Sequence, residues 1–192
     1  LCKEALNDKK AALADLDEVI SSSSEQPGAH LQALFRRAWV RKGLGSYADA
    51  EADYSQIIGM ENLPCNYLCM SLVNRAVCRE NLKSYTLALA DCRQAIEVEG
   101  ARSDHKAIAY FIMRDIYMRG RAYEKVLGYM EKVLQMSDLS PESVATAHIS
   151  IGDCYKAMHK KRLARESFKT ALSINGASSS TLQLAQRGLD SL

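Results

Sequence analysis

Six cysteines and four histidines are the side chains of this 192-residue chain best suited to metal binding or nucleophilic chemistry. The histidines share no ligand spacing, and Cys65 and Cys69 could face the same way across one helical turn without a second pair beside them. Structural zinc usually needs four ligands. We therefore expect no metal site and no cofactor. Cys78, Cys92 and Cys154 fall at apolar positions of helical patterns and are expected to be small core residues.

Motifs that mark common active sites are missing from the sequence. It contains no GxxxxGK[ST] or GxGxxG phosphate-binding loop, no HExxH zinc motif and no GxSxG nucleophile motif. We therefore expect a protein that is not an enzyme. An enzyme without these motifs is the weakest alternative, and a screen for turnover would test it.

Charge and hydropathy restrict the class of partner. The chain has 25 Lys and Arg residues and 23 Asp and Glu residues, which gives a net charge of +2. This charge is too close to neutral to indicate a protein that binds the phosphates of nucleic acids. There is no apolar run long enough to span a membrane and no signal peptide pattern. The scattered cysteines suit a reducing compartment, so a cytoplasmic location is expected. The start at Leu1 in mid-pattern suggests that more of the same pattern precedes it.

A repeat of 38 residues organises the chain. Residues 44–58 and 82–96 match at eight positions when one is shifted by 38, namely Leu44/Leu82, Ser46/Ser84, Tyr47/Tyr85, Ala50/Ala88, Ala52/Ala90, Asp53/Asp91, Gln56/Gln94 and Ile58/Ile96. Each unit has two apolar stripes at helical spacing, separated by a turn near Gly45, Lys83, Arg121 and His159. We therefore predict helix hairpins, with a first helix A and a second helix B, that must stack to bury both faces. Ser46 and Ser140 are expected to cap the helices that follow them.

The period divides the chain into one domain of successive units. We predict a partial repeat that supplies only helix B (1–28), four full repeats (29–66, 67–104, 105–142 and 143–178) and a C-terminal capping helix (179–192). The predicted fold class is all-α, a right-handed superhelical solenoid of antiparallel helix hairpins.

The fourth unit resembles the tetratricopeptide repeat (TPR). It carries the family pattern in Ile151, Gly152, Tyr155, Ala164, Phe168, Ala171 and Leu172. The period of 38 instead of 34 marks a variant. The resemblance implies that the A helices line a concave wall. It maps that wall onto Phe35, Arg36, Trp39, Met70, Val73, Asn74, Val77, Ile108, Phe111, Ile112 and Asp115 in the first three units, and onto the more polar Ile149, Ser150 and Asp153 in the fourth.

Arginines on helix A and an aspartate on helix B are present in the same repeats and absent from the same repeats. Where helix A carries two arginines one turn apart, helix B carries Asp53 or Asp91; where helix A is apolar there, helix B has Tyr129 or Ser167. We infer partly buried Arg–Asp pairs between helices, which fix the stacking register more than they add stability. The alternative is that these arginines lie in solvent.

These patterns favour a non-catalytic protein interaction or scaffold module whose groove binds an apolar peptide or helix of a protein partner. The alternative for the groove residues is burial by neighbouring helices. A TPR subclass grips acidic chaperone tails, but four of its five clamp positions fail here and only Asn74 matches, so such tails are disfavoured. Two other functions stay open: a regulatory or targeting domain cut from a larger enzyme, and a chaperone-like holder of hydrophobic secreted proteins.

Overall fold

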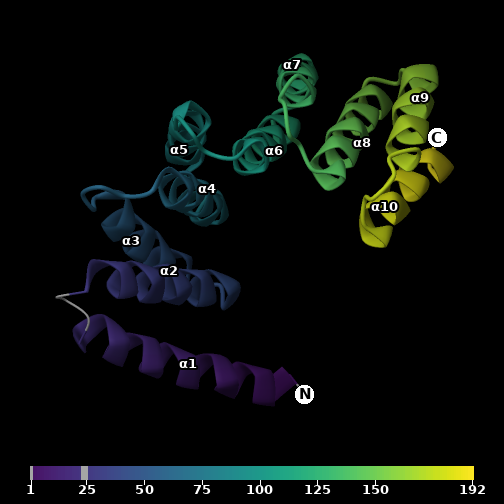
Figure 1. The fold of residues 1–192 in the computed structure, drawn as a ribbon. Helices are drawn as coiled ribbons and strands as arrows, with labels where there is room; N and C mark the ends of the chain where they lie inside the picture. Colours follow the sequence, from purple (N-terminus) through teal and green to yellow (C-terminus); the bar gives the residue numbers. More distant parts are fainter. Residues whose placement is uncertain (1, 23–25) are drawn as a thin grey trace. The chain divides into compact units, whose positions relative to one another are not determined.

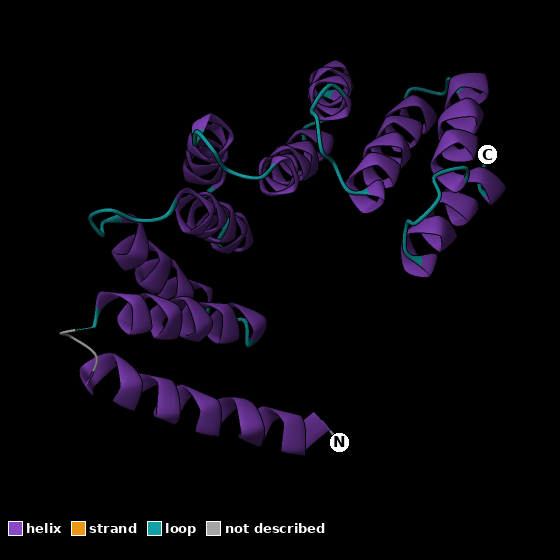
Figure 2. Cartoon of the chain, viewed as in Figure 1, coloured by secondary structure: helices purple, strands orange, loops and turns teal. Residues whose placement is uncertain are grey.

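The computed structural model describes residues 2–22 and 26–192, and side chains from residue 11 onward within those ranges. This described part consists of ten helices and contains no strand (Figures 1 and 2). The helices fall into two compact units, unit 1 (Leu1–Gly100) and unit 2 (Ala101–Leu192). Each unit is described below by itself.

Unit 1 contains a single helix followed by two hairpins. Helix α1 (Cys2–Ser22) packs on α2 (Pro27–Gly43), which pairs with α3 (Tyr47–Ile58); α4 (Cys65–Asn81) then packs on α3 and pairs with α5 (Tyr85–Glu97). Unit 2 contains α6 (Ser103–Arg119), α7 (Tyr123–Leu134), α8 (Pro141–Ala157), α9 (Lys161–Leu172) and α10 (Ser179–Asp190). In unit 2, α10 packs on both α8 and α9.

Helix starts recur with the predicted period. The A helices begin at residues 27, 65, 103 and 141, and the B helices at 47, 85, 123 and 161, so every step is 38 residues. The turn inside each hairpin places one residue in the left-handed backbone region, at Gly45 (φ 81°), Lys83 (62°), Arg121 (55°) and His159 (59°). These are the four positions predicted as turns, and a left-handed residue ends a helix by reversing the chain.

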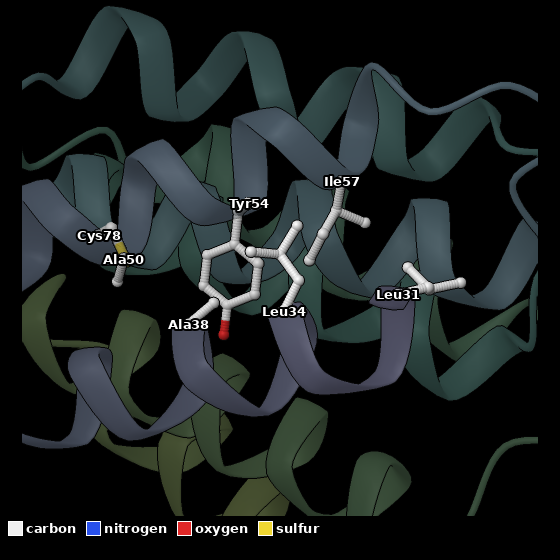
Figure 3. Close-up of a cluster of buried hydrophobic side chains, with 7 residues drawn as sticks. All are labelled: Leu31, Leu34, Ala38, Ala50, Tyr54, Ile57 and Cys78. Carbon is white, nitrogen blue, oxygen red and sulfur yellow. The ribbon is translucent and has the colours of Figure 1, made fainter. Parts of the chain in front are cut away.

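Small residues on helix A make room for large ones on helix B. In unit 1, the ring of Tyr54 on α3 lies beside Leu34 and Ala38 of α2, within a fully buried cluster (Figure 3). In unit 2, Phe168 of α9 occupies the space over Gly152 of α8 and Gly188 of α10, where an added Cβ would come within 2.7 and 2.4 Å of the ring. Glycine at both positions therefore lets three helices close on one ring.

The two expected helix caps differ. Ser140 accepts a hydrogen bond from the Ser143 N–H, as predicted, and Ser178 does the same for Thr181 at the start of α10. Ser46 precedes α3 but its side chain makes no capping hydrogen bond, so that prediction is wrong. Its backbone (φ −76°, ψ 62°) differs from the extended conformation of Ser140 (φ −66°, ψ 151°), which is the geometry that aims a serine side chain at the helix start.

Candidate partner-binding surface

A buried aspartate joins α2 to α3 in unit 1. Asp53, only 3% exposed, accepts hydrogen bonds from Arg37 Nε (3.1 Å) and Nη2 (2.6 Å) and from Arg41 Nη1 (2.8 Å). The remaining nitrogen of the same guanidinium, Arg37 Nη1, donates to Asp17 of α1 at 2.6 Å. One arginine of helix A therefore links the B helices on both sides of it.

The same arrangement recurs one repeat later. Asp91, 2% exposed, accepts from Arg75 Nε (3.0 Å) and Nη2 (2.7 Å) and from Arg79 Nη1 (2.8 Å). Arg75 Nη1 donates to Ser55 of the preceding B helix at 3.1 Å, and Arg79 Nε donates to Glu51 at 2.7 Å. The predicted Arg–Asp pairs between helices are thus confirmed at both positions. Because such pairs demand a fixed geometry, a role in setting the helix register is consistent with these contacts and stays a prediction.

Tyrosines replace this ion-pair network in the first hairpin of unit 2, at the repeat position where the sequence has Tyr129 in place of the aspartate. The ring of Tyr129 on α7 lies 5.7 Å from that of Tyr110 and 5.6 Å from that of Tyr117, both on α6. Lys125 Nζ lies 5.2 Å from the Tyr117 ring. Aromatic contact therefore takes the place of charge at this point of the repeat.

On α2, the predicted groove residues border an open cavity. Trp39 is 60% exposed, and Arg36 is exposed as well. Phe35 is half-buried, with its ring edge-on to Tyr54 (5.8 Å) and Tyr67 (5.5 Å). All three predicted residues line a cavity of about 610 Å³ between α2 and α1. The structure therefore brings this part of the predicted groove together.

On α4, the corresponding residues are largely covered. Val73 and Asn74 are 2% and 5% exposed, whereas Met70 and Val77 are half-buried. The Asn74 amide donates to the Met70 carbonyl at 2.8 Å and accepts from Lys42 of α2 at 2.5 Å. Val73 and Asn74 therefore offer little side-chain surface to a partner, and Lys42 of α2 already binds the Asn74 side chain.

On α6, as on α4, some of the predicted residues are buried and the others are half-buried. Ile112 is 5% exposed and belongs to the core, whereas Ile108, Phe111 and Asp115 are half-buried. The Arg114 guanidinium lies 5.4 Å from the Phe111 ring and pairs with Asp115 at 2.9 Å. The exposed part of this face is thus an aromatic ring beside an ion pair.

A second cavity, of about 550 Å³, lies within unit 2 between α6, α8 and α10. Its lining includes the predicted residues Asp115, Ile149, Ser150 and Asp153. Leu184 and Arg187 of α10 also line it, although the apolar pattern of residues 179–192 predicts only a capping helix. Desolvation raises the pKa of Asp153, opposed by the positive charges of Arg114 and Lys156.

Carboxylates of unit 2 also tie each A helix to the next. The Asp104 carboxylate accepts from the Ser140 N–H (3.0 Å) and from the hydroxyls of Ser140 (2.8 Å) and Ser143 (2.7 Å). Thirty-eight residues later, Glu142 accepts from the Ser178 N–H at 2.8 Å. Burial by itself would raise the pKa of Asp104, but these hydrogen bonds hold the pKa below its ordinary value.

The cysteines have the environment of core residues. Cys78, Cys92 and Cys154 are fully buried, and desolvation raises the pKa of the Cys78 thiol to about 11 and that of the other two to about 12. A thiol with a raised pKa is a poor nucleophile at neutral pH. In the described ranges no cluster of three His, Cys, Asp or Glu side chains is placed to hold a metal ion. Nor does any helix there have the length and apolar character needed to cross a bilayer.

Comparison with known proteins supports the repeat. The family model described as "Tetratricopeptide repeat" matches residues 145–178, which include most of α8 and all of α9. The chain contains a tetratricopeptide repeat. This confirms the resemblance of the fourth unit to the family. The family pattern has glycine at position 152, and the structure explains it, because the Phe168 ring occupies the space of a Cβ there. No curated protein matches the sequence.

Two solved structures share the fold. BtubC (BKLC) from P. vanneervenii is 18% identical with a TM-score of 0.76, over 95% of this chain and 80% of that one. A tetratricopeptide repeat protein from Parabacteroides merdae is 20% identical with a TM-score of 0.58, over 95% of this chain and 66% of that one. At these identities the likeness establishes the fold alone. The predicted fold class, an all-α helical repeat solenoid, is confirmed.

Proposed function

We propose that this protein is a non-catalytic interaction module that binds an apolar segment of a partner protein on the exposed faces of its A helices. TPR repeats generally mediate protein–protein interaction or scaffolding.

The observation that carries the proposal is the exposure of Trp39. Trp39 is 60% exposed at the edge of a 610 Å³ cavity, where it forms part of a contiguous apolar surface of the kind that marks interaction sites. Leu16 of α1 and Phe35 of α2 line the same cavity and extend its apolar surface. Tryptophan is also enriched among the residues that dominate binding energy at protein interfaces. This arrangement suits an apolar side chain of a partner inserted beside the indole.

In unit 2 the proposed surface is the cavity between α6, α8 and α10. Ile149 and Leu184, the latter 54% exposed, supply apolar area, and Arg114, Asp153 and Arg187 supply charges of both signs. Such a lining suits a segment with polar as well as apolar side chains.

Selection of a displayed peptide library on the intact chain tests the proposal. We expect it to enrich peptides with apolar or aromatic anchors. Trp39→Ala should weaken the selected peptides about 30-fold, the effect of losing a strong interface residue. Leu87→Ala is the matched control, because Leu87 is 51% exposed in the same unit on α5 and lines neither cavity. Equal affinities of the two variants, or enrichment of peptides without apolar anchors, would refute the proposed surface.

A further inference from the structure

Helix α10 holds the repeat position of an A helix. It begins at residue 179, which is 38 residues after the start of α8 at residue 141. It packs on α8 and α9, the A and B helices before it, just as α8 packs on α6 and α7 (Figure 1). Ser178 caps its start as Ser140 caps that of α8. The repeat therefore relates each residue of α10 to a residue of α8.

One face of α10 is polar where the other A helices are apolar. On α2, Leu34 and Ala38 form the face that packs on the B helix of the same hairpin, and both are fully buried. The same repeat positions on α10 hold Gln186 and Asp190, which are exposed, and the Gln186 amide donates to the Asp190 carboxylate at 2.7 Å. Such a pair stabilises a helix in water, so this face of α10 needs no further helix to cover it.

The face of α10 toward the cavity of unit 2 has a different character. Leu184 there is 54% exposed, and it is the one large apolar side chain exposed in unit 2, a unit whose residues are all described. Leu184 stands 38 residues after Thr146, and Arg187 stands 38 residues after Ile149. All four residues line the same cavity. Helix α10 therefore continues the wall that α6 and α8 begin.

The charges around this cavity leave one arginine without a counter-charge. Arg114 pairs with Asp115 on α6 at 2.9 Å. On α8, the carboxylate of Asp153 feels the positive charges of Arg114 and Lys156, which oppose the rise of its pKa. The guanidinium of Arg187 is exposed and forms no hydrogen bond or ion pair with any described residue. The lining thus has three cationic and two anionic side chains, and Arg187 supplies the excess.

We propose that α10 is a partner-contact helix, in which Leu184 contacts an apolar side chain of the bound segment and Arg187 pairs with a Glu or Asp side chain of the same segment. The inference rests on the proposed function, because it names the partner chemistry at the cavity of unit 2. Residues three apart are neighbours on one helix face, so the two partner side chains also lie close together. A carboxylate is the complement of the guanidinium, which binds it through two parallel hydrogen bonds, and the excess positive charge attracts it.

A displayed peptide library on the intact chain provides the probe, with each peptide fused through its C-terminus so that no free terminal carboxylate is present. Selected peptides that Leu184→Ala weakens are those bound at this cavity. Each of these is synthesised with an amidated C-terminus, once with its acidic residue and once with the corresponding amide residue. Fluorescence anisotropy should show the acidic form to bind about tenfold more tightly, as loss of a charge-assisted hydrogen bond predicts.

Two arginine variants test whether Arg187 is the partner of that acid. Arg187→Gln should abolish the preference for the acidic peptide. Arg165→Gln is the matched control and should keep the preference. Arg165 is an exposed arginine on the neighbouring helix α9, it lies outside the lining of the cavity, and its replacement changes the net charge by the same amount.

The outcomes separate this inference from the proposed function. Equal affinity of the acidic and amide peptides, or equal behaviour of Arg187→Gln and Arg165→Gln, would overturn the assignment of an acidic side chain to Arg187. If Leu184→Ala weakens none of the selected peptides, α10 is not a contact helix. Loss of binding on Trp39→Ala would still support the proposed function in each of these cases.

Discussion

The buried carboxylate of Asp53 offers the sharpest test of what holds the hairpins of unit 1 together. In Asp53→Asn the side chain keeps its shape but loses its charge, and its NH2 group cannot accept from either arginine. The arginine side chains of Arg37 and Arg41 are only 15% and 25% exposed, so solvent cannot fully replace the lost partner.

Removing one partner of a buried pair costs about 3 to 5 kcal/mol, and a hydrogen bond to a charged group contributes about 1.5 to 3 kcal/mol. Arg37 keeps its bond to Asp17 and the amide oxygen of the substituted side chain can still accept, so we expect a cost below that of breaking the whole pair and in the lower part of the hydrogen-bond range, about 2 kcal/mol. Asp49→Asn is the control, because Asp49 is exposed in the first turn of the same helix, and it should cost less than about 1 kcal/mol.

Urea unfolding gives the free energy of each variant, and hydrogen exchange with mass spectrometry shows where protection is lost. Protection should fall in α2 and α3. A third variant replaces Arg37, Arg41 and Asp53 together by Met, Tyr and Tyr, the residues found two repeats later at 113, 117 and 129. It should recover stability relative to Asp53→Asn, because no buried charge is then left unpaired. If Asp53→Asn is as mild as Asp49→Asn, the Asp53 carboxylate does not stabilise the pairing of α2 with α3 and the reasoning fails.

Unit 2 allows two further tests. Gly188→Ala should lower the free energy of unfolding by about 1 to 3 kcal/mol, because the added methyl group overpacks against Phe168. Gly128→Ala, which has nothing within 4 Å of an added Cβ, should raise it by up to about 1 kcal/mol. Urea unfolding measures both variants, and equal effects would contradict the packing of Phe168 against Gly188. The pKa of Asp104 in the folded protein lies below its ordinary value, so its contribution to stability is complete above about pH 4 and is lost as the pH falls through the lower, folded pKa. Asp104→Asn should therefore flatten the loss of stability below pH 4 in denaturation series, and an unchanged slope would exclude that role.

Features that depend on the repeat could be predicted from the sequence. The period of 38 placed the hairpins and the four left-handed turns, because a reversal between two helices needs a left-handed residue at a set distance from each apolar stripe. The Arg–Asp pairs could also be predicted, since both residue types change together from one repeat to the next. The missing cap at Ser46 could not, because capping depends on a backbone angle that residue type does not dictate.

The groove could be predicted only in part. Trp39 and Val77 hold the same repeat position, yet Trp39 is exposed and Val77 is half-buried, and residue type alone does not tell which of the two has a neighbour packed on it. The share of α10 in the cavity of unit 2 was likewise missed.

Sequence alone determined the repeat, its helices and its charged pairs, because these follow from local spacing and from comparison of one repeat with the next. Tertiary structure decided which of the equivalent side chains meet solvent. The exposure of a side chain depends on whether a neighbouring helix packs against it, and a periodic sequence shows the same pattern whether or not that neighbour is present.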